Sequence, residues 1–459
     1  GLFSNLDTDS IITQLMAIER KPVTLLETKQ KTLGYQKDAL NEVNNSLLSL
    51  KSSISSFASG LTFENKLSSS DESQLTGTAT SSASQGTYTI NVTSLAQKHI
   101  VATAEQDATW TAGAGVLSIT ATPDVPGPTF NINVAGQTLT QIRDLINAEP
   151  GFSAYGTAQV ITDPINNKQI LTITSANTGT ANRFTIVDGS GTLGTYSSQA
   201  AADAALTVNG VNIQSSSNTI TTAISGVTLN LKGKTGANPP AEITIGLDED
   251  AIVSKISDFV DKFNASTDLI DKYMKEEKVS DATTEEDMKK GVLQSDFDLG
   301  DSKSQVRMRT TGYVDNTLTT YKTLSQLGIE SEASVGSIVS NNITFDESKL
   351  RAALQGDKTE VGSLLQGWAT QLDTYLESET EVSVSSTLAG NYYRRILSIN
   401  DQISSIDDEI TNWEDKLASE EERLRSQFSA MEEALQKLQT QSTYITNQLS
   451  SISSSKSSS

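Results

Sequence analysis

The side chains that most often carry catalysis are sparse in this chain. There is no cysteine and one histidine, His99. A lone histidine with no cysteine and no neighbouring carboxylate builds neither a catalytic triad nor a histidine-based zinc site. Without cysteine there are also no disulfides, thiolate metal sites or thiol nucleophiles. We therefore interpret His99 as a surface or boundary residue between two β units.

Other residues of catalytic type do not converge either. Carboxylate pairs occur at Glu285 with Glu286 and at Asp248 with Asp250, but 56 acidic residues make such pairs expected by chance. Nothing in the sequence places one pair across a cleft. The glycine-rich stretch at 189–194 lacks the Lys-Ser/Thr ending of a phosphate-binding loop, so we interpret it as a linker. The sequence predicts no enzyme activity, no catalytic residues, no cofactor and no metal.

Apolar residues instead recur at coiled-coil spacing near both ends of the chain. The N-terminal set repeats every seven residues and comprises Leu26, Leu33, Leu40, Leu47, Ile54 and Leu61. The C-terminal set alternates steps of three and four and comprises Ile396, Ile399, Ile403, Ile406, Ile410, Trp413, Leu417, Leu424, Phe428, Met431, Leu435, Leu438, Ile445, Leu449 and Ile452. Each set forms one narrow stripe on a helix, and each stripe needs a partner helix to cover it. The sequence therefore predicts that both chain ends meet in one helical rod.

Two local irregularities interrupt these helices. Pro22 predicts a kink or a new helix start in the N-terminal segment. In the C-terminal segment, Leu417, Glu420, Leu424 and Phe428 are spaced by three, four and four residues, a stutter that locally unwinds a left-handed supercoil. Glu420 lies on the seam. We interpret it as a partly exposed carboxylate that the seam tolerates; the alternative is a polar residue that sets the register.

Composition narrows the possible partners. The chain of 459 residues has 34 Lys and Arg against 56 Asp and Glu, a net charge of −22. Such a surface repels phosphate backbones, so we expect no nucleic-acid partner. The sequence contains no run of about 18 apolar residues, so it predicts no membrane-spanning helix. Residues 1–20 also lack the basic start and apolar core of a cleavable signal peptide.

The middle of the chain reads as β structure. Tyr88, Ile90 and Val92 alternate with polar residues, as in a half-buried strand, and Asn209-Gly210 is typical of a tight hairpin turn. The predicted fold class is therefore a multidomain α+β protein. Its N- and C-terminal helices form a coiled coil and a helical bundle, and β-rich domains are inserted between them.

Several segments resemble the bacterial flagellar filament cap proteins, the hook-associated protein 2 family. They are LDTDSIITQLMAIERKPVTLLETKQ, SQGTYTINVTSLAQ, FNINVAGQTLTQIRDLIN, LTITSANTGTANRFTI, LTVNGVNIQSSSNTITTAISGVTLNLKG, GVLQSDFDLG, LSQLGI, ITFDESKLRAAL and EERLRSQFSAMEEALQKLQTQSTYI. Their order along the chain is the family's order, and they span nearly the whole sequence.

The resemblance implies four structural parts. They are a terminal coiled-coil or leg domain from 1–37 and 440–459, a helical-bundle core with a small β element from 38–95 and 248–439, an inner β-rich head domain from 96–112 and 200–247, and an outer β-rich head domain from 113–199. The leg domain is expected to dock at the filament end, and the head domains to close the lumen.

The resemblance also implies a function. We expect a non-enzymatic cap at the distal, extracellular end of the flagellum that promotes flagellin folding and insertion and prevents flagellin leakage. The expected partners are further copies of the chain in a ring-like homo-oligomer, most often of five subunits, flagellin, the hook–filament junction proteins, and the export chaperone and export apparatus. Export of an unfolded chain without a cleaved signal peptide agrees with the missing cysteines.

The stripe residues are the predicted sites of subunit or flagellin contact. They are Leu40, Leu47, Ile54, Leu424, Phe428, Met431, Leu435 and Leu438. For Leu40, Leu47 and Ile54, pairing within the chain is the preferred interpretation. Alternative functions are another axial protein of the flagellum (a flagellin or a junction protein), a tip-exposed adhesin, and an intracellular coiled-coil scaffold. The quoted segments favour the cap.

Overall fold

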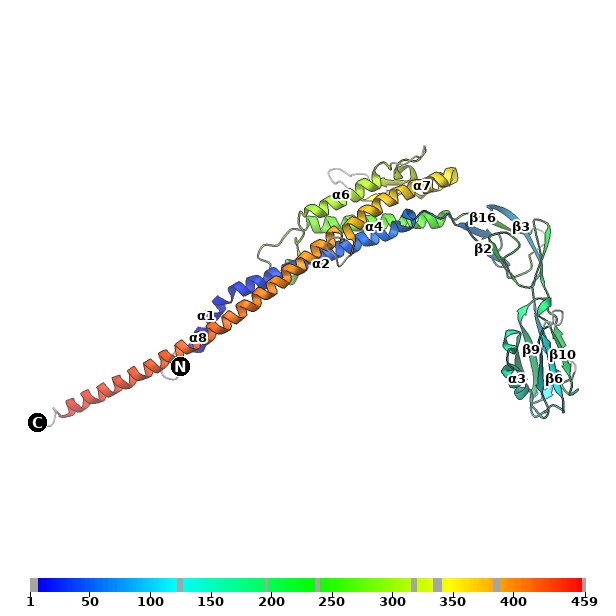
Figure 1. Ribbon diagram of the computed structural model, residues 1–459, viewed down its shortest axis with the longest axis horizontal. Coiled ribbons are helices and arrows are strands. Elements are labelled where there is room, and N and C mark those ends of the chain that lie inside the picture. The colour runs from blue at the N-terminus through cyan, green and yellow to red at the C-terminus, as the bar shows by residue number, and fades with distance from the viewer. Residues whose placement is uncertain are drawn as a thin grey trace. The chain divides into compact units, whose positions relative to one another are not determined.

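The chain forms a helical unit and a β unit. A computed structural model describes residues 7–121, 127–194, 197–235, 240–314, 320–332, 341–382 and 389–455. The helical unit comprises Gly1–Leu61 and Asp250–Ser459, and the β unit comprises Thr62–Glu249. Helices at both chain ends and strands between them, both visible in Figure 1, confirm the predicted multidomain α+β class.

The helical unit packs around a buried tryptophan. Its helices are α1 (Thr8–Glu19), α2 (Lys21–Ala58), α4 (Glu249–Lys275), α5 (Glu285–Lys289), α6 (Phe297–Thr311), α7 (Glu347–Thr380) and α8 (Asn391–Ser455). The Trp368 side chain of α7 is fully buried, with its ring centre 4.7 Å from that of Phe259 and 6.1 Å from that of Phe57. Three helices therefore share one aromatic core. A short 3-10 helix (Leu324–Leu327) and the pair β17 (Ile329–Ser331) and β18 (Ile343–Phe345) complete the unit.

A first β module lies where the chain enters and leaves the β unit. Its strands are β1 (Asn65–Ser69), β2 (Leu75–Ala79), β3 (Gly86–Ser94), β12 (Ala204–Val208), β13 (Val211–Ser215), β14 (Thr219–Ile220), β15 (Val227–Leu231) and β16 (Ala241–Leu247). They form one sheet in the order β1-β16-β3-β12-β13 and another in the order β14-β15-β2. Alternate side chains fill one shared core. Asn209, at φ 48°, and Gly210 make the predicted hairpin turn between β12 and β13.

A second β module has its own core. Its elements are β4 (Lys98–Ala102), β5 (Gln106–Asp107), β6 (Val116–Ala121), β7 (Thr129–Asn133), α3 (Leu139–Ala148), β8 (Gly156–Asp163), β9 (Lys168–Thr178), β10 (Phe184–Asp188) and β11 (Ser197–Gln199), with two short 3-10 helices, Phe152–Ala154 and Thr180–Asn182. One sheet runs β11-β4-β9-β5 with β8 on β9, and the other runs β10-β6-β7. A capping box of Thr138 and Gln141 starts α3, whose Ile142 and Ile146 are buried in this core.

The domain boundaries differ from those expected from the sequence. The expected helical core includes residues 38–95, but β3 lies between β16 and β12, where both of its edges are hydrogen-bonded. The expected inner head domain includes residues 96–112, but β4 and β5 pair with β9 of the second module. Strand pairing is the reason for both corrections.

Candidate assembly surface on the terminal helices

The longest element of the molecule is α8, a helix of 65 residues that carries the C-terminal stripe. In its first part the stripe is closed. Ile396, Ile399, Ile406 and Leu417 are each less than a tenth exposed. The helix α2 packs along this part of α8, and α1 packs on α8 farther toward the C-terminus of α8. Figure 1 shows α1 and the start of α2 lying along α8.

Polar pairs fix the direction and register of this coiled coil. Gln30 donates to Asp407 at 2.7 Å, Arg20 pairs with Glu414 at 2.7 Å, and Arg425 pairs with Asp9 at 2.9 Å. Residue numbers rise on one helix as they fall on the other, so the helices are antiparallel. These pairs lie at the surface, where solvent screens them, so they specify register more than stability.

The break between α1 and α2 lies at Arg20. Pro22 is in the first turn of α2, where its missing N–H costs no helical hydrogen bond. This confirms a new helix start at the predicted position. The Arg20 guanidinium joins Glu27 of α2 and Glu414 of α8 at 3.3 and 2.7 Å, so one side chain bridges the helix break and the partner helix.

Coverage of the α8 stripe declines toward the C-terminus. Leu424, Phe428 and Leu435 are half-buried, and Met431 is 38% exposed. Beyond them Leu438 is 61% exposed and Leu449 is also 61% exposed, although the heptad continues. Among the described residues, α1 is the last element that packs on this helix, and its first residue is Thr8. The stripe thus passes from a closed core to an open apolar face.

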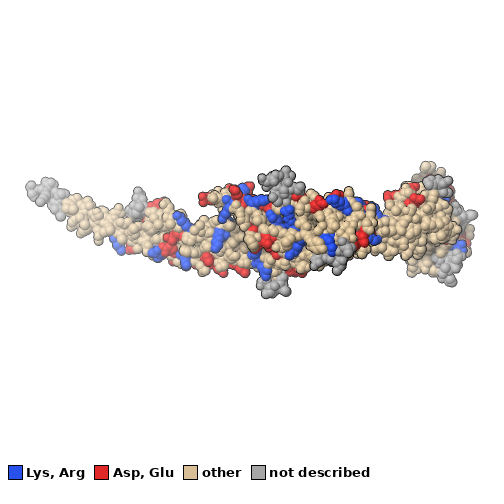
Figure 2. All heavy atoms as spheres, turned by 90° about the horizontal axis from the view of Figure 1, so that it is seen from above, with Lys and Arg blue, Asp and Glu red and all other residues tan. Residues whose placement is uncertain are grey.

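The open part of α8 is nearly free of charge. Residues 434–455 contain no acidic residue and a single basic one, Lys437, in a chain with a net charge of −22. Residues beside the seam, such as Gln439, Gln441 and Thr446, are neutral. On the face drawn in Figure 2, blue and red residues are interspersed along the helical unit and become scarce toward its C-terminal tip. A neutral flank neither attracts nor repels a helix by charge, so apolar contact decides what binds here.

The helices α1 and α2 also carry exposed apolar residues. They were not singled out as contacts from the sequence, and they are Leu15 at 40%, Ile18 at 57% and Leu25 at 71% exposure. Tyr444 and Ile445 of α8 are also well exposed. The signal that could have identified Ile445 was present, because it continues the heptad. Ile18 and Leu25 lie off the inward stripe, and only the structure separates them from the core.

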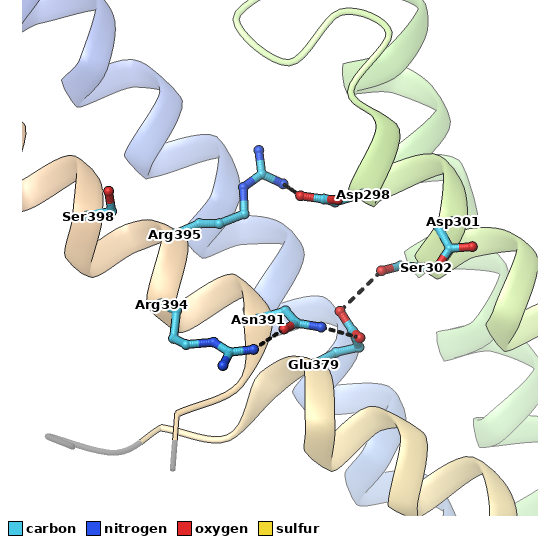
Figure 3. A pocket seen from close by; sticks show the side chains of 8 residues that line it. All are labelled: Asp298, Asp301, Ser302, Glu379, Asn391, Arg394, Arg395 and Ser398. Carbon is cyan, nitrogen blue, oxygen red and sulfur yellow. Dashed lines mark hydrogen bonds and ion pairs between the residues drawn. The ribbon is translucent and has the colours of Figure 1, made fainter. Parts of the chain in front are cut away.

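At its first turn α8 is tied to α6 and α7. The buried carboxylate of Glu379 accepts hydrogen bonds from Asn391 Nδ2 at 2.7 Å and from Ser302 Oγ at 3.4 Å, as Figure 3 shows. Arg395 of α8 pairs with Asp296 at 2.5 Å and with Asp298 at 3.2 Å. All of these residues except Asp296 line a cleft of about 390 Å³. Burial raises the pKa of Glu379.

The structure separates the eight predicted contact residues into two groups. Leu40, Leu47 and Ile54 are at most 1% exposed, inside the helical unit. They are part of the helical unit's own core. The remaining five form one line along α8, and they are Leu424, Phe428, Met431, Leu435 and Leu438. Glu420, between these groups on the seam, is half-buried and pairs with Arg423 of its own helix.

The apolar and neutral polar side chains of this surface are suited to contact with another helix. No cluster of three or more His, Cys, Asp or Glu side chains in the described ranges is placed to hold a metal ion. No helix in the described part of the chain combines the length and apolarity needed to cross a bilayer. What the surface presents is a long, incomplete coiled coil. Helices from both chain ends along an open seam, with β modules inserted between them, are the architecture of a structural protein.

Comparison with known proteins identifies the kind of assembly. The models of the flagellar hook-associated protein 2 N-terminus and C-terminus match residues 4–99 and 201–440. Flagellar hook-associated protein 2 of Escherichia coli K12 is 28% identical over 386 residues, which cover 80% of each chain. The A-type protein of Pseudomonas aeruginosa is 30% identical over 298 residues, 58% of this chain and 60% of its own length.

A solved structure agrees with this assignment. The D1-D2-D3 domains of the flagellar cap protein FliD from Escherichia coli superpose with a TM-score of 0.56 at 27% identity, covering 79% of this chain and 99% of that one. The chain belongs to the flagellar hook-associated protein 2 family and is a filament cap protein.

Proposed function

We propose that α1, the start of α2 and the distal part of α8 form the leg that docks this cap onto flagellin at the filament end. The observation that carries the proposal is the decline of coverage along α8, from Leu417 at 7% exposure to Leu438 at 61%. A heptad that continues without a covering helix is a binding site for other helices. Met431 and Leu435 lie at the transition.

The leg is stable within the chain only in its proximal part. Each residue fixed in a helix loses roughly 1–2 kcal/mol of backbone entropy, which buried apolar area must offset. Leu438, Ile445 and Leu449 bury little of that area in the isolated chain. Flagellin that covers them at the filament end supplies it. Assembly therefore orders the distal leg, and cap attachment depends on it.

The cap acts as a ring-like homo-oligomer, for which we propose five subunits. Its β modules close the lumen, retain flagellin and shelter its folding before insertion. The chain acts without catalysis and meets the hook–filament junction proteins before the filament grows. It is exported unfolded by the flagellar export apparatus with its chaperone, without a cleaved signal peptide, and the absence of cysteine supports this route.

Paired charges on α8 test the docking site. Replacing Leu435 and Leu438 with Asp places two carboxylates on the seam, and we expect loss of stable attachment to filament ends. The matched control replaces Gln436 and Thr440 with Asp, which adds the same charge on the exposed polar face. Electron microscopy of filament ends and flagellin released into the medium are the readouts.

The seam variant should give short filaments and released flagellin, whereas the control should resemble the natural protein. Circular dichroism should show an unchanged β unit in both variants. Equal attachment of the two variants would overturn the docking role of α8.

A further inference from the structure

The helical unit carries a second exposed apolar face, outside the seam between α2 and α8. Ile18 of α1 is 57% exposed, and Leu25 of α2 is 71% exposed. Lys21 and Lys29, both exposed, lie one helical turn before and after Leu25. Val23, at the same level of α2, is fully buried, so α2 turns one side to the core and the other to solvent. We call Ile18, Lys21, Leu25 and Lys29 the Leu25 face.

The Leu25 face is basic, and the chain does not neutralise it. Among the described residues neither Lys21 nor Lys29 forms an ion pair. The adjacent Arg20 pairs with Glu27 at 3.3 Å. Glu19 is the remaining acid between residues 18 and 29, and the two lysines outweigh it. Uncompensated positive charge thus lies beside exposed apolar side chains, in a chain whose net charge is −22.

The outer side of α8 carries the opposite charge in a regular line. Asp408 lies two residues from the buried Ile406, about 200° around the helix, and therefore points away from the seam. Exposed acids recur on this side every seven residues, and we call them the acidic line: Asp401, Asp408, Asp415 and Glu422. The residues between them on the same side are small or neutral, namely Ser404, Ser405, Thr411, Asn412, Ala418 and Ser419. Such a surface leaves room for apolar side chains of another helix between its acids.

The acidic line is not neutralised within the chain either. None of its four carboxylates forms an ion pair with another described residue. The bases nearest in sequence are engaged elsewhere, since Lys416 lies 5.0 Å from the centre of the Trp413 ring and Arg423 pairs with Glu420. Arg425 pairs with acids of α8 and α1. A cationic surface from outside the chain would relieve the repulsion among the four acids.

We propose that the Leu25 face of one copy packs on the acidic line of the next copy. This contact deepens the proposed ring assembly and rests on it. Both surfaces point away from the seam between α2 and α8, so they do not cover each other within one chain. Because they are different surfaces of one chain, the contact is heterologous, and repetition by a fixed rotation closes a ring.

A second copy is the favoured occupant because one chain carries both complementary halves. Two copies of a chain with a net charge of −22 repel each other on average. Opposite charges matched at one pair of surfaces offset that repulsion locally and determine which surfaces meet. The exposed Ile18 and Leu25 then lose contact with water between the acids of α8.

Charge exchange between the two surfaces tests the contact. Lys21→Glu with Lys29→Glu makes the Leu25 face acidic, and Asp408→Lys with Asp415→Lys makes the line on α8 basic. Each pair alone should raise the concentration needed for half assembly, from light scattering, about tenfold or more, because like charges then meet. All four substitutions together restore opposite charges at every contact and keep the net charge of −22, so they should restore assembly.

The matched control is Lys255→Glu with Lys358→Glu, two exposed lysines of α4 and α7. It changes the net charge as much as the Leu25-face pair does and should assemble like the natural protein. Circular dichroism should show an unchanged fold in every variant, since all the substituted side chains are exposed. Raising the salt from about 0.05 to 0.5 M should shrink the difference between each pair and the natural protein, because salt screens exposed charges.

The outcomes separate this contact from the ring itself. Failure of the fourfold variant to recover, or equal weakening by the control, would overturn the contact. Variants that assemble normally but do not attach to filament ends would assign the Leu25 face to flagellin and overturn the contact while the ring stands. A natural chain that stays monomeric at every concentration would overturn the contact and the proposed ring together.

Discussion

His99 supplies a hydrogen-bond acceptor to the backbone of the second β module. Its Nδ1 accepts from the Phe184 N–H at 2.9 Å, and its own N–H donates to Ser175 Oγ at 3.0 Å. An acceptor at Nδ1 requires the neutral ring. Burial first, and the charge of Arg183 second, lower the pKa of His99 from 6.5. His99, which the sequence analysis interprets as a surface or boundary residue, therefore supports the backbone of the second β module.

The lowered pKa of His99 predicts a loss of stability in acid. Above pH 6.5 the ring is neutral in both the folded and unfolded chain. As pH falls below 6.5 the unfolded chain binds a proton that the folded module resists, so the free energy of unfolding declines. Thermal melts of the β unit between pH 7.5 and 5 measure this. His99→Asn keeps an acceptor without titrating and should show a smaller decline; equal declines would contradict the assignment.

The pKa of Glu379 is shifted upward, opposite to the shift of His99. Burial raises its pKa, against the hydrogen bonds from Asn391 and Ser302, so the protonated form is more favoured in the folded helical unit than in the unfolded chain. Stability contributed by the proton is present below the ordinary carboxyl pKa and is lost as pH rises through the raised value. Glu379→Gln retains both hydrogen-bonding partners, Asn391 and Ser302, without a charge. We expect it to melt higher than the natural protein at pH 7.5 and nearly equally at pH 4. A lower melting temperature at pH 7.5 would show that the charge is stabilising.

At the scale of elements, α2 contains one glycine that the helix does not need. Gly34 is in the interior of this 38-residue helix, and a Cβ there would meet nothing within 4 Å. Gly34→Ala should stabilise the helical unit by about 0.5–1 kcal/mol, because alanine loses less backbone entropy on folding. Urea unfolding followed by circular dichroism measures the change.

Gly328 is the control for that substitution. Its φ is +88°, and a Cβ would lie 2.3 Å from the Asp346 carbonyl oxygen, so Gly328→Ala should destabilise the unit. A destabilising Gly34→Ala would mean that α2 requires the freedom of glycine at this position.

The sequence predicts which residues share a helical stripe or a strand better than it predicts which other elements pack against them. A period of three and four places Ile396 and Leu438 on one stripe of α8 whatever packs against it. It does not say that Ile396 is 5% and Leu438 61% exposed, because exposure depends on where the partner helix begins. The strands show the same limit. Alternation identified Ile90 and Val92 as a strand, but only pairing shows that β3 lies between β16 and β12.

At the scale of the whole molecule, the β unit is a self-contained insertion. Both β cores lie within Thr62–Glu249. The chain enters on β1 and leaves on β16, and these strands are antiparallel partners from Asn65 opposite Leu247 onward. The Asp248 N–H also donates to the Glu64 carbonyl at 2.9 Å. The two ends of the insertion are therefore held together by the β unit's own hydrogen bonds.

This closure predicts that residues 62–249 fold when excised. Their apolar cores need no helix, and no new loop has to be closed, so the fragment should melt cooperatively. Its transition should lie within about 4 °C of the β-unit transition in the full chain, the shift that 1 kcal/mol produces in a domain of this size.

A fragment cut at the sequence-based boundary, 96–247, removes β1, β2 and the central strand β3, leaving Leu206 and Ile243 without their shared sheet neighbours. We expect that shorter fragment to lack a cooperative first module, as measured by calorimetry and amide exchange. A stable 96–247 beside an unfolded 62–249 would mean that strands 65–94 belong to the helical unit after all.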